Sequence, residues 1–236
     1  MNALVSGMQT ALQDNFLFKR MANTSPQSVS ASAWNKVIAL DLLERGIIFT
    51  IFGLFALRTF DKLTVSHDLR FYLLLLSEII PMVFLLLRRP SPTLSDRPSD
   101  WLIGVSGSIA PLLITPSPAH PLVPYFICYI IIVSGICVQL SAKIILGLSF
   151  GIIAANRGVK IEGPYRFIRH PMYAGYTMAH IGLLLAMPVA MNAFWYGIAF
   201  MLLVSRMNRE ERVLSQSQEY RDLMKRVPYR LFPGVY

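Results

Sequence analysis

Residues 163–175, in the C-terminal half of the chain, carry side chains suited to holding a charged ligand. Arg169 and His170 stand directly before Pro171, which opens an apolar stretch. Proline suits the first position of a helix, where its missing N–H loses no hydrogen bond. The free N–H groups of that first turn, with the positive end of the helix dipole, favour an anion such as a carboxylate. We therefore expect Arg169 and His170 to flank a ligand site at the start of a helix.

The helix expected after Pro171 carries polar side chains on one face. They follow the spacing i, i+3, i+4 and i+7 and are Tyr173, Tyr176, Thr177 and His180. Inside a membrane such a stripe is expected to face the bundle interior or a cavity rather than lipid. The alternative is interhelical hydrogen bonding by Tyr, Thr and His, which we favour for His180 taken alone.

A second group of charged side chains follows the last apolar stretch, in residues 206–214. Long charged side chains at a helix end often extend into the lipid headgroups, but that does not account for the paired acids Glu210 and Glu211. Arg206 and Glu210 are spaced i,i+4, so an ion pair between them would hold the Glu210 carboxylate toward the helix interior. In that position Glu210 is expected to bind a ligand ammonium.

The elements that position these groups belong to a membrane protein. The chain has 236 residues, of which 54% are hydrophobic and only 15% charged, which departs from a soluble composition. Its formal charge of +9 is concentrated in loops between apolar stretches, where anionic lipid headgroups account for it better than nucleic acid does. We therefore expect membrane lipids as partners and no nucleic acid.

The pattern of apolar stretches predicts an all-α, polytopic membrane helix bundle with about six transmembrane segments. They are expected at residues 37–57, 71–87, 101–114, 125–155, 172–187 and 192–205. The short connection at residues 188–191 makes the last two an antiparallel hairpin. The chain divides accordingly into a flexible or interfacial segment (1–33), N-terminal transmembrane helices (34–123) and a C-terminal core (124–236).

Basic residues in three loops predict the orientation of the bundle. They cluster in residues 88–97, 157–169 and 206–212, and loops rich in Lys and Arg face the cytoplasm. Both termini and the C-terminal cofactor-binding region would then be cytoplasmic, in a bacterial inner membrane or an equivalent one. Taken alone, residues 219–233 read as an interfacial amphipathic helix followed by an extended end. The sequence gives no indication of the oligomeric state.

The C-terminal motifs together resemble the isoprenylcysteine carboxyl methyltransferase family, membrane enzymes related to phospholipid N-methyltransferases. The resemblance covers about residues 124–236. It rests on four motifs in order, Gly163-Pro164-Tyr165, Arg169-His170-Pro171-Met172-Tyr173-Ala174-Gly175, Glu210-Glu211-Arg212-Val213-Leu214, and Glu219-Tyr220 followed by Arg226-Val227-Pro228.

The resemblance implies that S-adenosyl-L-methionine binds at the cytoplasmic end of the bundle, between the Arg-His-Pro helix and the Glu-Glu helix. The residues that would line this cofactor are Gly163, Pro164, Tyr165, Arg169, His170 and Tyr173, with Lys160 as a weaker candidate. Glu210 would meet the cofactor's amino group. Arg226 would lie near the acceptor group and, with Glu210, is the expected catalytic residue.

The physical chemistry of methyl transfer agrees with a site in the membrane. Transfer from a sulfonium to a carboxylate or thiolate neutralises two charges, so a dry site with fixed orientation favours it. Neither a metal nor a covalent nucleophile is required, and the sequence contains no metal-ligand motif or nucleophile elbow. A lipophilic or lipid-borne acceptor would enter between helices.

Four other functions stay open. In the leading interpretation the acceptor is an isoprenylcysteine-like or other lipid carboxylate. The first two alternatives are methyl transfer to a phospholipid amine and methyl transfer to a thiol. A sterol-reductase-like enzyme that uses NADPH is a third alternative, although such reductases have more helices than this chain supplies. A non-catalytic membrane scaffold that keeps the fold is the fourth.

Overall fold

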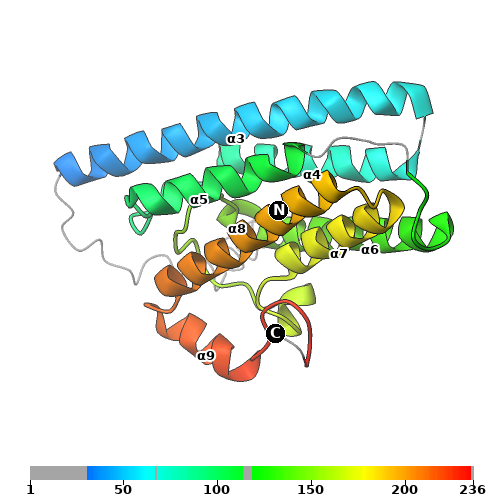
Figure 1. The fold of residues 1–236 in the computed structure, drawn as a ribbon. Helices are drawn as coiled ribbons and strands as arrows, with labels where there is room; N and C mark the ends of the chain where they lie inside the picture. The colour runs from blue at the N-terminus through cyan, green and yellow to red at the C-terminus, as the bar shows by residue number, and fades with distance from the viewer. Residues whose placement is uncertain (1–30, 67, 114–118, 235–236) are drawn as a thin grey trace, which may run out of the picture. The chain divides into compact units, whose positions relative to one another are not determined.

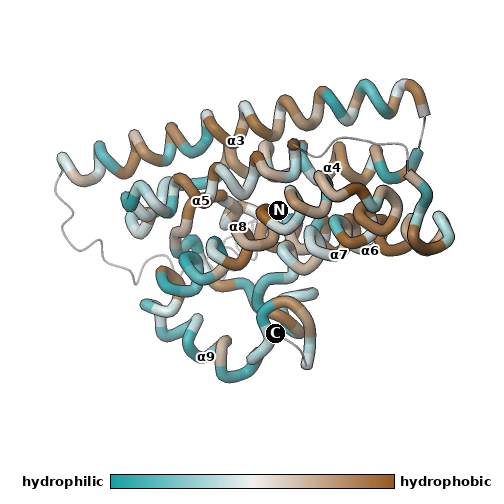
Figure 2. The backbone as a smooth tube through the Cα atoms, viewed as in Figure 1, coloured by the Kyte–Doolittle hydropathy of each residue, from teal (hydrophilic) through white to brown (hydrophobic). Residues whose placement is uncertain are grey.

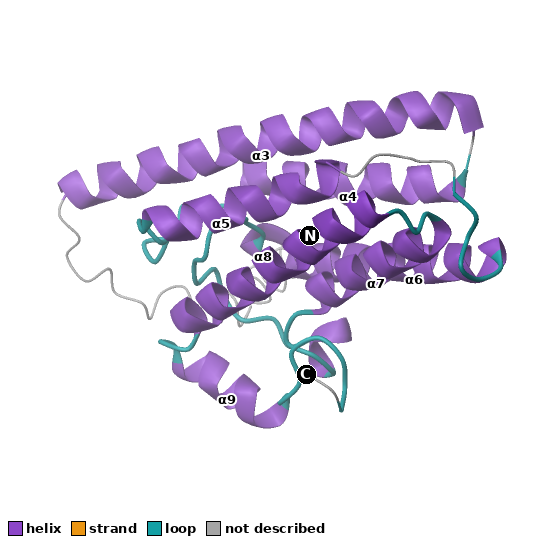
Figure 3. Ribbon diagram, viewed as in Figure 1, coloured by secondary structure: helices purple, strands orange, loops and turns teal. Residues whose placement is uncertain are grey.

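The described part of the chain is helical and contains no strand (Figure 3). A computed structural model describes residues 31–66, 68–113 and 119–234, so nearly all of the segment predicted at 1–33 lies outside the described residues. The α-helices are α3 (Ala31–Ser66), α4 (Leu69–Leu87), α5 (Pro98–Ile109), α6 (Tyr125–Leu146), α7 (Pro171–Ala186), α8 (Ala190–Leu214) and α9 (Gln218–Arg226). Three short 3₁₀ helices join them, η1 (Ala110–Leu113), η2 (Gly147–Ser149) and η3 (Gly163–Arg166).

Residues 37–236 form one structural unit, and the helices of this unit make up the predicted all-α bundle (Figure 1). Hydrophobic residues are frequent along α4, α6, α7 and α8, whereas hydrophilic residues dominate α9 (Figure 2). Many large apolar side chains point outward, among them Leu42, Leu57, Leu76, Leu86, Leu102 and Phe126. Exposed apolar surface of this extent is typical of a protein embedded in lipid.

Three helices among the described residues are long and apolar enough to cross a membrane. They are Leu69–Leu87, Tyr125–Ser149 and Ala190–Leu214. The other predicted crossings differ in length or charge: α5 has 12 residues, α7 has 16 residues, and α3 carries charged residues near both ends of its apolar part. The bundle is therefore confirmed, while the number of six crossings stays a prediction.

Several helix boundaries differ from the predicted ones. The loop expected at residues 58–70 is largely helical, because α3 continues to Ser66. The helix expected to reach residue 155 ends at Leu146, where Gly147 adopts a positive φ of 54°, a conformation that glycine adopts at little cost. In contrast, α8 extends nine residues beyond Ser205 to Leu214, so Glu210 and Glu211 lie on a regular helix.

Helices α6 and α7 pack in backbone contact at two glycines. A Cβ atom added at Gly175 would lie 2.5 Å from the Gln139 backbone nitrogen and 2.6 Å from the Gly135 carbonyl oxygen. One added at Gly135 would lie 2.6 Å from the Ala179 nitrogen. Small residues allow such close approach between membrane helices. This crossing fixes the start of α7, and with it Arg169 and His170, relative to α6.

A buried ion cluster joins α3 to the loop that follows η2. Glu44 accepts hydrogen bonds from Arg88 at 2.5 Å and Arg157 at 2.7 Å, and its Oε1 accepts the backbone N–H groups of Ile152 at 2.8 Å and Ile153 at 2.9 Å. Charged groups this deeply buried are stable only when they are paired in this way. The cluster therefore holds the loop leading to residues 158–160.

The glycine crossing predicts a large effect of a single methyl group. Gly175→Ala should destabilise the protein by about 1–3 kcal/mol, because overpacking forces the two helix backbones apart. Gly197→Ala is the matched control, since a Cβ there meets no atom within 4 Å and alanine is the better helix former. Thermal unfolding in detergent measures both; equal midpoints for the two variants would contradict the proposed backbone contact.

Candidate active site

The Glu211 carboxylate holds together the two ends of the candidate site. Its Oε1 accepts hydrogen bonds from Arg169 Nε at 2.9 Å, from the Tyr220 hydroxyl at 3.4 Å, and is paired with His170 Nε2 at 3.2 Å. Its Oε2 accepts from Arg230 at 2.6 Å. The side chain is only 7% exposed. Glu211 therefore connects α8 with the start of α7, with α9 and with the C-terminal segment.

The C-terminal segment pairs with the residues before α7. The Arg169 N–H donates to the Tyr229 carbonyl at 3.0 Å, and the next N–H, that of His170, donates to the next carbonyl at 2.9 Å. The Arg169 guanidinium also donates to the carbonyls of Val227 at 2.8 Å and Pro228 at 2.7 Å. The segment interpreted from sequence as a simple extended end is thus part of the site, and Figure 1 shows it beside the start of α7.

The other acid of the pair, Glu210, also faces the start of α7 from α8. It accepts a short hydrogen bond from the Tyr173 hydroxyl and one from Arg206 Nε at 3.2 Å, as the i,i+4 spacing predicts. His170 Nδ1 lies 3.9 Å from Glu210 Oε2. The start of the Arg-His-Pro helix and the end of the Glu-Glu helix therefore converge.

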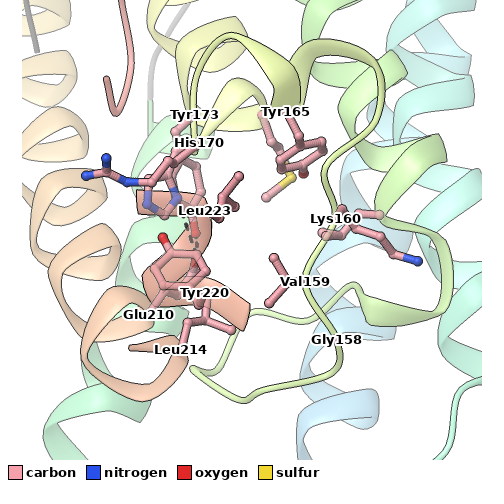
Figure 4. Close-up of a pocket in the computed structure, with 13 residues that line it drawn as sticks. Gly158, Val159, Lys160, Tyr165, His170, Tyr173, Glu210, Leu214, Tyr220 and Leu223 are labelled. Carbon is pink, nitrogen blue, oxygen red and sulfur yellow. Dashed lines mark hydrogen bonds and ion pairs between the residues drawn. The ribbon is translucent and has the colours of Figure 1, made fainter. Parts of the chain in front are cut away.

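A cavity of about 80 Å³ lies at this convergence. His170, Tyr173, Glu210 and Tyr220 gather on one side of it, and Val159 and Lys160 lie across from them (Figure 4). Its walls come from α6, α7, α8, α9 and the loop held by the Glu44 cluster. The cavity combines one carboxylate with several tyrosine rings, and both kinds of group attract cations.

Two tyrosine hydroxyls at the cavity stay protonated. Burial is the main cause that raises the pKa of Tyr165, with the nearby negative charge of Glu210 as a second cause. Burial likewise raises the pKa of Tyr220, and the Glu211 charge adds to the effect. Both groups are therefore neutral hydroxyls near neutral pH. They supply aromatic surface to the cavity rather than negative charge.

The structure brings six of the predicted site residues to this cavity. They are Lys160, Tyr165, Arg169, His170, Tyr173 and Glu210. The Lys160 ammonium points away from the other labelled side chains (Figure 4). Arg169 lines the cavity, but its guanidinium already donates to Glu211 and to two carbonyls.

The remaining three predicted residues do not line the cavity. Gly163 and Pro164 form the first turn of η3 and place Tyr165 in the wall. Gly163 has a positive φ of 54°, and a side chain there would collide with Ile145. Arg226 lies on the exposed side of α9, where its Nε donates to the Asp222 carbonyl at 3.4 Å, so the structure does not bring it together with the others.

Sequence reasoning missed three residues of the site. Glu211 was noted as half of a paired acid but received no role, although neighbours on a helix point about 100° apart and both can face a concave site. Tyr220 and Arg230 reach Glu211 from the tail. Tyr220 belongs to the Glu-Tyr motif of the tail and Arg230 follows the Val-Pro motif, but neither motif indicated what these side chains contact.

A larger cavity, of about 300 Å³, lies deeper in the bundle. Mostly apolar side chains from α3, α4, α5, α6, α7 and α8 line it, and Tyr176, His180 and Arg206 are among its polar members. The polar stripe predicted on α7 therefore faces a cavity at Tyr173, Tyr176 and His180. Thr177 differs, because its hydroxyl donates to the Tyr173 carbonyl at 2.9 Å within the same helix.

Met172 and Tyr173 line both cavities. These two residues of the first turn of α7 thus form a wall between the outer cavity, where charged side chains such as His170 and Glu210 gather, and the deeper cavity within the bundle. Arg206 and Glu210 repeat the arrangement on α8, since Arg206 lines the deeper cavity and Glu210 the outer one. A group in one cavity is separated from a group in the other by little more than these side chains.

Part of the chain is similar to a known protein family. Residues 123–221 match the family model described as phospholipid methyltransferase, close to the core predicted at 124–236. The match supports the broader family of membrane methyltransferases that act on lipid. The match does not specify an isoprenylcysteine acceptor. No curated protein matches the chain.

The contacts of Glu211 predict that it is required for stability. Glu211→Ala should lower the free energy of unfolding by about 3–5 kcal/mol, because removing one partner leaves buried charges unpaired. Asp222→Asn is a control on the exposed face of α9 and should change stability by no more than about 0.5 kcal/mol. Thermal unfolding in detergent compares the two variants. A Glu211→Ala midpoint equal to that of the control would rule out this stabilising role of Glu211.

Proposed function

We propose that this protein transfers a methyl group from S-adenosyl-L-methionine to a lipophilic acceptor, with a carboxylate of an isoprenylcysteine-like or other lipid compound as the leading acceptor. The observation that carries the proposal is the shared wall of Met172 and Tyr173 between the two cavities. A water-soluble donor and an apolar acceptor need different surroundings, yet must meet within bonding distance. Two cavities that adjoin at one helix start provide this arrangement.

The lining of the outer cavity suits the positively charged part of the donor. Members of phospholipid methyltransferase families generally use S-adenosyl-L-methionine, which supplies a methyl group activated by a positive sulfonium. Glu210 would pair with the ammonium, and the rings of Tyr165, Tyr173 and Tyr220 would face the remaining positive charge. His170, stacked on Tyr173 with ring centroids 5.6 Å apart, would orient the ligand beside Glu210.

Arg206 is the residue that we propose for the acceptor group. It lines the deeper cavity, and its guanidinium lies 5.4 Å from the centroid of the Tyr173 ring. A planar guanidinium pairs with a carboxylate through two parallel hydrogen bonds. The sequence assigned this role to Arg226, whose guanidinium lies outside the lining of both cavities.

A carboxylate acceptor places few chemical demands on the protein. No proton has to leave it, so the side chains only need to bind, orient and exclude water. The apolar lining of the deeper cavity, from residues such as Ile51, Phe55 and Leu203, suits this task. A phospholipid amine is the second candidate, favoured by the description of the matching family, and it would additionally have to lose a proton.

The proposed membrane orientation places the outer cavity at the cytoplasmic surface. Exposed basic residues of α9, among them Arg221, Lys225 and Arg226, accompany the basic loops that predicted this side. Lys and Arg residues next to the end of a membrane helix favour placing that end on the cytoplasmic side. The soluble donor would enter the outer cavity from there.

Binding of S-adenosylhomocysteine tests the donor site. Glu210→Gln and His170→Ala should each weaken its affinity about 10-fold or more, as expected for a lost charge-assisted hydrogen bond of about 1.5–3 kcal/mol. Arg226→Gln is the matched control and should bind as the wild type does. Isothermal titration with the purified protein in detergent measures all three, and equal affinities throughout would count against the donor site.

Mass spectrometry of lipids tests the reaction and its acceptor. Expression of the wild type should produce lipids that gain one methylene in mass, and mild alkaline hydrolysis should remove it if the product is a methyl ester rather than an N-methyl amine. Arg206→Lys should raise the acceptor KM about 10-fold, with donor affinity nearly unchanged. Arg226→Gln is the control; an effect on KM in that variant and none in Arg206→Lys would reverse the assignment.

A further inference from the structure

Two neighbouring polar side chains of the deeper cavity have no hydrogen-bond partner. His180 of α7 and Tyr196 of α8 both line the cavity, and their ring centroids lie 4.7 Å apart. Within the described part of the chain, neither side chain forms a hydrogen bond or an ion pair. Neither is among the groups whose unpaired polar atoms are fully buried, so the imidazole nitrogens and the hydroxyl keep accessible area where these residues line the cavity.

Other polar side chains of this cavity are engaged within the protein. Arg206 donates to Glu210 and to the Gly151 carbonyl, and the Ser108 hydroxyl donates to the Gly104 carbonyl within its own helix. An unpaired polar group in apolar surroundings costs about 1–3 kcal/mol, and membrane helices have an apolar alternative at every position. Helix packing alone therefore gives no reason for an imidazole beside a phenol hydroxyl in this cavity.

The position of His180 along α7 sets a distance within the cavity. The cavity follows one face of this helix from Met172 to Met187, which is about 22 Å at the helical rise of about 1.5 Å per residue. His180 lies seven residues beyond Tyr173 on this face, or about 10 Å from the wall that the two cavities share. The ring contact places Tyr196 beside His180, so two polar groups open into the cavity well away from that wall.

We propose that His180 and Tyr196 are specificity-determining residues that hydrogen-bond an oxygen on the body of the methyl acceptor, about 10 Å from its methylated end. The assignment of this cavity to the acceptor rests on the proposed function. A hydroxyl on the ligand fits both residues, because it donates one hydrogen bond and accepts others, and a neutral imidazole and a phenol do the same. A site built to hydrogen-bond such a group discriminates against an analogue that lacks it, because its own polar atoms are then left unpaired.

This distance narrows the acceptor to a lipid carboxylate that carries an oxygen in the middle of its chain. An extended carbon chain advances about 1.2 Å per bond, as an extended backbone does. With the carboxylate at Arg206, the oxygen would then stand near the ninth carbon, and a chain of about 18 carbons would follow the cavity to its end. An isoprenylcysteine carries only hydrocarbon at that distance from its carboxylate, so it would leave His180 and Tyr196 unpaired.

Two positional isomers test the proposal. The hydroxyl of 9-hydroxystearate would reach the level of His180, whereas that of 14-hydroxystearate would lie near Leu183, an apolar residue of the lining. Equilibrium binding of each isomer to the full chain is measured in phosphatidylcholine nanodiscs without S-adenosyl-L-methionine, with empty nanodiscs as the reference. The wild type should bind 9-hydroxystearate about 5-fold more tightly, which corresponds to one net hydrogen bond of about 1 kcal/mol.

Tyr196→Phe removes only the hydroxyl and should reduce the preference, and the double variant His180→Leu with Tyr196→Phe should abolish it. Tyr129→Phe is the matched control, since its hydroxyl donates to Asp68 at 3.4 Å outside the cavity lining, and it should keep the preference. Without ligand, Tyr196→Phe should unfold at the wild-type temperature or above, because the lost hydroxyl has no partner; a structural role would lower the midpoint. If the double variant does not fold, Tyr196→Phe decides alone.

Three results would overturn the proposal: equal binding of the two isomers to the wild type, as expected if the pair binds only water, an unchanged preference in Tyr196→Phe, or no binding of either isomer. A wild-type preference that Tyr196→Phe reduces, found together with absent methyl transfer, would support the binding role and reject the proposed reaction. Methyl transfer to lipid, found together with equal binding of the isomers, would do the reverse. The two conclusions are therefore separable.

Discussion

The buried carboxylate of Glu211 constrains the whole C-terminal part of the structure. A charge with little access to water has to be paired on several sides, and Arg169, His170 and Arg230 provide that pairing at 2.6–3.2 Å. Each partner lies on a different part of the chain from Glu211. The requirement to satisfy one charge thus brings together the start of α7, the end of α8 and the tail, and the outer cavity is the space enclosed between them.

The same principle operates at the other end of the loop that borders this cavity. Glu44 of α3 collects Arg88, Arg157 and two backbone N–H groups, and burial is the main cause that lowers the pKa of Arg157. Each carboxylate lies on a helix and holds a segment that has no regular hydrogen-bonding pattern of its own, the loop after η2 for Glu44 and the tail for Glu211. Ion pairs therefore fix the positions of the loop and the tail, whereas helix packing at Gly135 and Gly175 fixes α6 and α7.

The predictions from sequence were accurate where the signal was local. Pro171 opens a helix because proline suits a first turn, and helical periodicity places Arg206 beside Glu210 and Tyr173 and Tyr176 on one cavity. His180 lines that cavity too, although interhelical hydrogen bonding was the favoured expectation for it. The roles of Glu211 and Arg230 depend on contacts between distant parts of the chain, which no spacing encodes. Arg226 shows the converse, since a motif position predicted a role for a side chain whose contacts lie on the surface of α9.

The position of Tyr173 explains why the enzyme would place its chemistry at the end of a bundle rather than in its middle. Its hydroxyl donates to Glu210 at the outer cavity, and Tyr173 also lines the deeper cavity. A site deeper in the membrane would have to desolvate a cationic donor completely, at a cost that unpaired charges in low dielectric make large. A site further out would expose the acceptor chain to water. In the proposed function the first turn of α7 is the place where both conditions would be met, and the ion pairs around Glu211 hold that turn in position.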